Sequence, residues 1–179
     1  MRKIFILGLL PLFALTGCRE EPATGLPDFR GDIQLLTPEK TSLTSNDSEA
    51  AEVVTLTMPE SEKTYQVEIS AGCKLNTKGA KPQIQLAPGA YIKSVSTVTV
   101  DRLMVDFFGT KGTFFSVYSN AEGTGSTVRD YEAPKDLPVY DPDGGGKVLQ
   151  YPINSEGWMI KNETEYNKPT FYAIYICLG

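Results

Sequence analysis

The chain has no histidine, and this sets the first limit on the chemistry that its side chains can perform. Without imidazole, Ser-His and Cys-His nucleophile systems and histidine-ligated metal centres are excluded. Carboxylate pairs are the remaining route to hydrolysis, because two acids about 5–10 Å apart can cleave a glycosidic bond. Asp101 with Asp106, and Asp141 with Asp143, are such pairs in the sequence. Any acidic domain contains such pairs, so we expect a protein that is not an enzyme.

The most pointed spacing is Tyr-Asp-Pro-Asp-Gly-Gly-Gly at residues 140–146. Asp141 and Asp143 match the start of a calcium-binding loop, which wraps carboxylates and carbonyls around Ca²⁺. The EF-hand pattern also needs a later glutamate, and Lys147 and Val148 follow instead. Two interpretations stay open: a Ca²⁺ site, or a plain Asp-Pro, Asp-Gly turn, which is favoured. No other cofactor is predicted.

Aromatic rings near predicted loops indicate sugar binding, because a flat ring stacks on the C–H face of a sugar while carboxylates bond its hydroxyls. The segment 131–146 is too polar and too rich in Gly and Pro for a strand ladder, and it is longer than the usual connection of about 4–6 residues. We therefore predict that it forms the main ligand-facing surface. Trp158 alternates with Ile160, so a core position is the favoured alternative for that ring. The candidate ligand-binding residues are Tyr131, Tyr140, Asp141, Asp143 and Trp158.

The elements that must position these residues are strands, since residues 53–179 alternate apolar and polar side chains and show no helical period. The densest stretch is residues 91–118, where a Gly-Thr-Lys-Gly break at 109–112 predicts a hairpin between two central strands. Further strands are expected at residues 53–58, 65–69, 83–86, 128–132, 148–153, 158–162 and 171–178. The fold class is therefore all-β, an antiparallel β-sandwich of the Greek-key or jelly-roll kind.

The first residues are a targeting segment. Arg2 and Lys3 precede the apolar residues 4–15, which are fewer than the about 20 helical residues that cross a bilayer core, so residues 1–17 are a signal peptide. The Leu-Thr-Gly-Cys sequence at residues 15–18 resembles the lipobox of bacterial lipoproteins. That resemblance implies that Cys18 receives a diacylglycerol and anchors the protein in a membrane.

The residues after Cys18 bear on which membrane surface the protein reaches. Position 19 is Arg, so the aspartate that favours inner-membrane retention in many Gram-negative bacteria is missing, and Glu20-Glu21 is similar to the export signal of surface lipoproteins. The resemblance implies an outer-membrane protein, lipid-anchored and displayed on the cell surface. Residues 18–52 are rich in Pro, Ser, Thr and acids, which predicts a flexible tether before the sandwich domain of residues 53–179. Within the tether, residues 32–37 are expected to add a strand to the edge of the domain.

Charge and cysteine content limit the partners. Removal of residues 1–17 takes the chain from 17 basic residues to 15 against 22 acidic ones, a net charge of −7. That balance argues against nucleic acid and leaves the lipid anchor as the contact with the membrane. Cys73 and Cys177 are the thiols that remain in an oxidising compartment, which predicts a disulfide. A pair of separated buried thiols stays open as the alternative.

Several short motifs of residues 65–178 are similar to those of a known fold family. They are Gly89-Ala90-Tyr91-Ile92, Val98-x-Val100, Phe115-x-Val117-Tyr118, Gly123-Thr124-Gly125 and the closing residues 172–176. In these the chain resembles the galactose-binding-like jelly rolls of carbohydrate-binding modules. The expected function is that of a non-catalytic envelope protein that binds glycan or assists a neighbouring carbohydrate-handling system. The alternative is a pilus-like or assembly protein that interacts with neighbouring envelope proteins through β-strand augmentation by its terminal strand.

Overall fold

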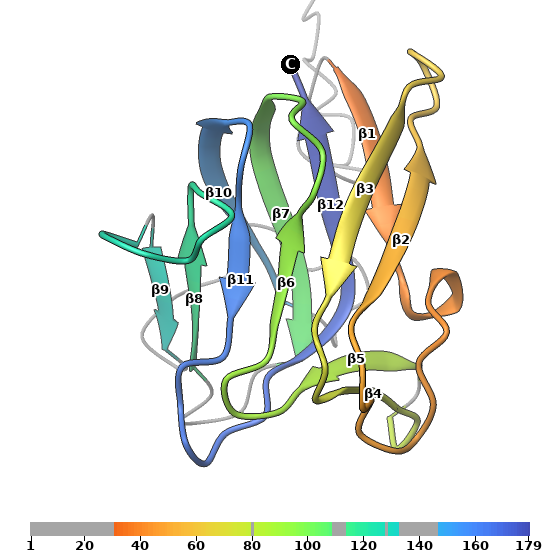
Figure 1. The fold of residues 1–179 in the computed structure, drawn as a ribbon, viewed down its shortest axis with the longest axis vertical. Coiled ribbons are helices and arrows are strands. Elements are labelled where there is room, and N and C mark those ends of the chain that lie inside the picture. The colour runs from red at the N-terminus through yellow and green to blue at the C-terminus, as the bar shows by residue number, and fades with distance from the viewer. Residues whose placement is uncertain (1–30, 80, 109–113, 128, 133–146) are drawn as a thin grey trace, which may run out of the picture.

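The computed structural model describes residues 31–79, 81–108, 114–127, 129–132 and 147–179, which fold into two antiparallel sheets packed face to face (Figure 1). This confirms the predicted antiparallel β-sandwich. The described elements are β1 (Asp32–Leu36), the 3-10 helix η1 (Pro38–Lys40), β2 (Glu52–Thr57), β3 (Thr64–Ile69), β4 (Cys73–Asn76), β5 (Gln83–Leu86), β6 (Tyr91–Ser94), β7 (Val100–Phe108), β8 (Phe114–Tyr118), β9 (Arg129–Glu132), β10 (Lys147–Ser155), β11 (Met159–Lys161) and β12 (Thr170–Leu178).

Each sheet has six strands among the described residues. The front sheet in Figure 1 has the order β2-β3-β6-β11-β8-β9, and the back sheet has the order β10-β7-β12-β5-β4 with β1 beside β12. The chain changes sheet at every step between consecutive strands except β2 to β3, β4 to β5 and β8 to β9. These crossings give the jelly-roll connectivity and place β12 inside the back sheet, with β7 on one side and β5 and β1 on the other.

The predicted hairpin of residues 91–118 does not form. β7 belongs to the back sheet, where it pairs with β10 and β12, whereas β8 belongs to the front sheet, where it pairs with β11 and β9. The central position of β7 is confirmed. Strand-forming composition is the same for a hairpin and for a crossing between layers, so the sequence signal does not separate the two.

The core lies between the sheets and is rich in aromatic rings. Phe115 of the front sheet meets Phe107 and Phe171 of the back sheet edge to face, with ring centroids 5.4 Å and 5.2 Å apart. Such pairs contribute about 0.5–1.5 kcal/mol each beyond the area they bury. All three rings are fully buried, so they fix the spacing of the two layers on this side of the sandwich.

β1 closes one seam of the sandwich, which confirms the predicted edge strand near residue 32. It pairs antiparallel with β12, from Asp32 opposite Leu178 to Leu36 opposite Ile174. The Asp32 carboxylate also accepts the backbone N–H groups of Glu60 and Ser61 at 2.9 and 2.8 Å, in the turn between β2 and β3. β1 therefore joins the back sheet through its backbone and the front sheet through a side chain. The predicted tether is part of the sandwich from Asp32 onward.

Asn162 fixes the connection between β11 and β12. Its side chain is fully buried, and its Nδ2 donates to the carbonyls of Leu86 at 3.2 Å and Asn167 at 2.6 Å. Its Oδ1 accepts from the Thr164 N–H at 3.1 Å and the Thr164 hydroxyl at 2.7 Å. The amide thus has a partner for each donor and lone pair, as a buried amide requires.

Candidate ligand-binding face

The predicted ligand-facing segment lies mostly outside the described residues. Tyr140, Asp141 and Asp143 fall there, so their roles in ligand or Ca²⁺ binding stay predictions. Tyr131 lies in β9, where its backbone is opposite Phe115 of β8, and its side chain is not described.

Trp158 is a core residue, so the interpretation of its ring as a ligand contact is wrong. The indole is fully buried, and its Nε1 donates to the Tyr65 hydroxyl at 2.9 Å. Burial raises the pKa of Tyr65 to about 12, which keeps the hydroxyl protonated. The alternation of Trp158 with Ile160 was the correct signal, because both side chains face the interior.

Cys73 and Cys177 are free thiols, so the predicted disulfide is wrong. Cys73 begins β4 and packs into the core between the sheets. Cys177 lies on the other face of the back sheet, in a cluster with Met104 and Val148. Side chains on opposite faces of a sheet point away from each other, so these two sulfurs cannot bond. Burial raises the pKa of Cys73 to about 11 and of Cys177 to about 12, so both stay protonated.

The outer face of the front sheet carries a polar cluster on β3 and β6. The Tyr91 hydroxyl donates to Glu68 Oε1 at 2.7 Å, and Lys93 Nζ lies 3.4 Å from the same oxygen. Lys93 Nζ also lies 5.2 Å from the centre of the Tyr91 ring, within cation–π range. The hydrogen bond to Glu68, and then burial, raise the pKa of Tyr91. Since Ile92 occupies the core, Tyr91 and Lys93 on either side of it face outward.

A second cluster surrounds Glu163, just beyond β11. Its carboxylate accepts the Tyr118 hydroxyl at 2.7 Å, the Ser116 hydroxyl at 3.2 Å and Lys161 Nζ at 3.0 Å. Burial alone would raise the pKa of Glu163, but the hydrogen bonds from Tyr118 and Lys161 and the charge of Lys161 outweigh it and lower the pKa. Glu163 is therefore an ionised acceptor and not a proton donor near neutral pH.

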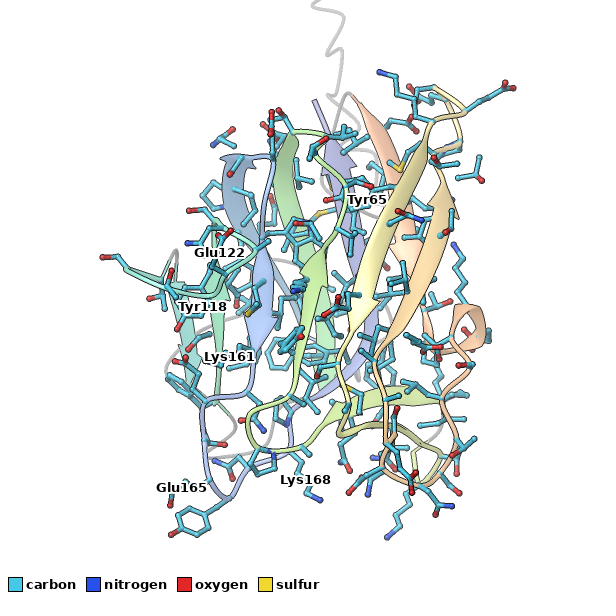
Figure 2. The ribbon with its side chains drawn as sticks, in the orientation of Figure 1. Tyr65, Tyr118, Glu122, Lys161, Glu165 and Lys168 are labelled. Carbon is cyan, nitrogen blue, oxygen red and sulfur yellow. The ribbon has the colours of Figure 1, made fainter. Side chains whose placement is uncertain are left out.

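Strand register brings the two clusters together on one face. β11 lies between β6 and β8, and Lys161 is opposite both Tyr91 of β6 and Ser116 of β8. Figure 2 shows Lys161 and Tyr118 on these neighbouring strands of the front sheet. We call the outward-facing line of β6 and β11 the front-face strip. It consists of Tyr91, Lys93 and Val95 beside Lys161, whereas Met159, opposite Lys93, is 5% exposed and lies beneath the turn after β8.

A groove of about 270 Å³ lies at the upper end of the front-face strip, where three connections meet. Ser94 at the end of β6 and residues 95–97 after it line one side, and residues 120–122 and 155–157 line the other. A Cβ on Gly157 would lie 2.8 Å from the Ala121 nitrogen, so this glycine lets the two turns touch. A Cβ on Gly123 would lie 2.3 Å from Met159 Sδ, so the turn after β8 also lies against β11.

This arrangement is suited to recognition by non-covalent contacts. The front face presents the ammonium group of Lys93, the carboxylates of Glu68 and Glu163 and the partly exposed ring of Tyr91, each held in place by a neighbour. Within the described ranges, no group of three or more His, Cys, Asp or Glu residues is placed to hold a metal ion. No helix in that part of the chain is long and apolar enough to cross a membrane.

The front-face clusters were missed by sequence reasoning, which searched loops for ligand contacts. The parity of Tyr91, Lys93 and Val95 was a usable signal, because Ile92 between them is apolar. The pairing of β6 with β11 was not readable, because about 65 residues separate them in the chain.

Comparisons with known proteins do not assign the chain to a family. No family model and no curated protein matches the chain. Among solved structures, the chain is similar to the K2 cleaved adhesin domain of Lys-gingipain, with a TM-score of 0.37 and 9% identity, over 82% of this chain and 90% of that chain. A likeness at that level carries no argument about function.

Proposed function

We propose that the protein is a lipid-anchored, non-catalytic protein of the outer membrane and cell surface that binds glycans through its front face. It acts alone or as an accessory to a neighbouring carbohydrate-handling system. The observation that carries the proposal is the pair of clusters around Glu68 and Glu163, which the register of Lys161 and Tyr91 makes continuous. Sugars need this combination, because their hydroxyls both donate and accept while their C–H faces pack on a ring.

The bonding of the carboxylates supports binding over catalysis. Glycoside hydrolysis needs one carboxyl group that keeps a proton and a second that is ionised. Glu163 is held ionised by three donors, and Glu68 accepts from a phenol beside an ammonium group. These two carboxylates are therefore preorganised as hydrogen-bond acceptors.

The anchor rests on the sequence alone. Residues 19–31 separate Cys18 from β1, which leaves a short tether between the membrane and the sandwich. Cells fed a labelled fatty acid should label the wild-type protein and not the Cys18→Ala variant, because the thioether has no other site. Label on the variant would contradict the anchor and leave glycan binding untouched.

Glycan binding is tested by an array probed with the mature chain carrying Cys18→Ala. Tyr91→Ala removes the ring and releases Glu68 and Lys93, so we expect a loss of about 1–2 kcal/mol, or about 5–30-fold in Kd, typical of a contact residue. Tyr166→Ala is the matched control, because this tyrosine is 88% exposed beyond the far end of β11. Binding that is lost equally in both variants, or in neither, would contradict the assignment of the front face.

The same glycan-binding assay tests the predicted segment 131–146. If that segment contacts the ligand, Tyr140→Ala should weaken binding by a similar amount. The alternative of β-strand augmentation receives no support in its predicted form. Augmentation predicts an exposed or exchangeable edge strand, and the terminal strand β12, to which it was assigned, is paired on both sides.

A further inference from the structure

The front-face strip is continuous with the groove. A ligand that lies along the strip therefore places one particular part of its chain in the groove. The strip runs along β6 from Tyr91 to Val95, the residue just after the strand, with Lys161 of β11 beside Tyr91. At about 3.3 Å per residue it is about 13 Å long, enough for a short oligosaccharide and too long for one ring. Val95 also lines the groove, so the last residue of the strip is the first residue of the groove.

The far side of the groove is closed to a chain that continues along the strip. Gly157 lies against Asn120 and Ala121, where a Cβ would come within 3.3 Å of the Asn120 Cα. The turn after β8 and the turn after β10 therefore form one wall at the end of β11. A chain laid on the strip meets this wall, so its end and not its middle occupies the groove.

The chemistry of the groove favours an uncharged end group. Hydroxyl and amide groups from Thr97, Asn120 and Ser155 line it, and Val95, which is 44% exposed, adds an apolar contact. Two exposed glutamates, Glu122 and Glu156, stand in the same lining and repel an anionic ligand. The groove is smaller than the about 300–1,000 Å³ of sites for drug-sized ligands, which suits a single sugar ring.

We propose that the groove binds the terminal residue of a neutral glycan chain whose following residues lie on the front-face strip. This inference rests on the proposed glycan binding and adds two requirements: a free chain end, and the absence of an acidic group on it. If the flat face alone bound the glycan, neither a free chain end nor an uncharged end would be needed.

The test uses the mature chain carrying Cys18→Ala and a panel of neutral oligosaccharides, each attached to the surface through its reducing end or through its non-reducing end. Binding should occur in one orientation at least about tenfold more strongly than in the other, because only one end enters the groove. The same oligosaccharides with the free end oxidised to a uronic acid should bind more weakly. In a double variant with E122Q and E156Q, the difference in affinity between the neutral and the oxidised oligosaccharides should be smaller.

Thr97→Trp fills the groove from an exposed position and should reduce binding at least about tenfold. Thr77→Trp, at an exposed position just after β4 of the back sheet, is the matched control and should bind like the parent. Equal binding in both orientations, or full binding by Thr97→Trp where Tyr91→Ala has lost it, would overturn the inference and leave the proposed function standing. No binding to any glycan would overturn both.

Discussion

Replacing Asn162 by alanine tests how the connection between β11 and β12 is held. The substitution removes four side-chain hydrogen bonds, two donated by Nδ2 and two accepted by Oδ1, from a fully buried position. At about 1 kcal/mol net for each bond, the free energy of unfolding should fall by about 4 kcal/mol. That is a large part of the about 5–15 kcal/mol available to a domain, so the melting temperature should fall by roughly 10 °C.

Urea unfolding followed by tryptophan fluorescence measures this loss, because Trp158 is the single tryptophan of the chain and is buried. Asn46→Ala is the matched control, since Asn46 is exposed in the connection before β2 and should change stability by less than about 0.5 kcal/mol. A loss below about 1 kcal/mol for Asn162→Ala would refute the reasoning that this amide holds the connection.

Asn162→Asp sharpens the test, because the new carboxylate keeps the bonds from Thr164 and loses both donors to the carbonyls of Leu86 and Asn167. Burial and the two carbonyls should raise the pKa of the new carboxyl in the folded protein. Folding then favours its protonated form, so the variant should be least stable near neutral pH and should recover as the pH falls toward about 4. A variant as stable as the wild type at pH 7 would contradict this account.

Phe115→Ala should lower the free energy of unfolding by about 3–5 kcal/mol in the same assay, since it empties the centre of the aromatic contacts between the sheets. Thiol titration of Cys73 and Cys177 should find neither in the folded protein and both after unfolding without reductant, whereas two unreactive cysteines would restore the disulfide. The ionised Glu163 should stabilise the protein above its ordinary pKa of 4.5, an advantage over E163Q that disappears as the pH falls below it. Tyr118→Phe should raise the Glu163 pKa in an NMR titration, and an unchanged value would show that the phenol does not hold the carboxylate.

Much of the fold could be predicted, because alternation reports which side of a strand is buried. The segments at residues 65–69 and 83–86 correspond to β3 and β5, where Val67 and Ile84 face the core. β4 was missed because Cys73–Asn76 is short and follows Gly72, which has a positive φ of 81° and closes a turn. Short polar strands beside a glycine have the same composition as turns.

Two features were beyond the sequence: the sheet to which a strand belongs, and the facing direction of side chains in a strand such as β12 that is buried on both faces. The two wrong predictions follow from these. The hairpin prediction failed because β7 and β8 carry strand signals but lie in different layers. The disulfide prediction failed because one parity of β12 faces the core through Ile176, while Cys177 beside it faces the other way. The number of cysteines indicates whether a disulfide is expected in an oxidising compartment, but it does not show in which direction a cysteine side chain points.

The two outer faces of the sandwich show why the candidate site lies on the front sheet. On the back sheet, the side chains that face away from the core include Met104, Val148 and Cys177, which are buried in a second apolar cluster. On the front sheet, the corresponding positions are occupied by hydrogen-bonded polar groups such as Glu68 and Lys161. Ordered polar side chains lose little freedom when a polar ligand binds, so their donors and acceptors contribute affinity that flexible surface chains do not. The groove adjoins this preorganised face, and a ligand that spans both would draw its affinity from the strip and its selectivity from the groove.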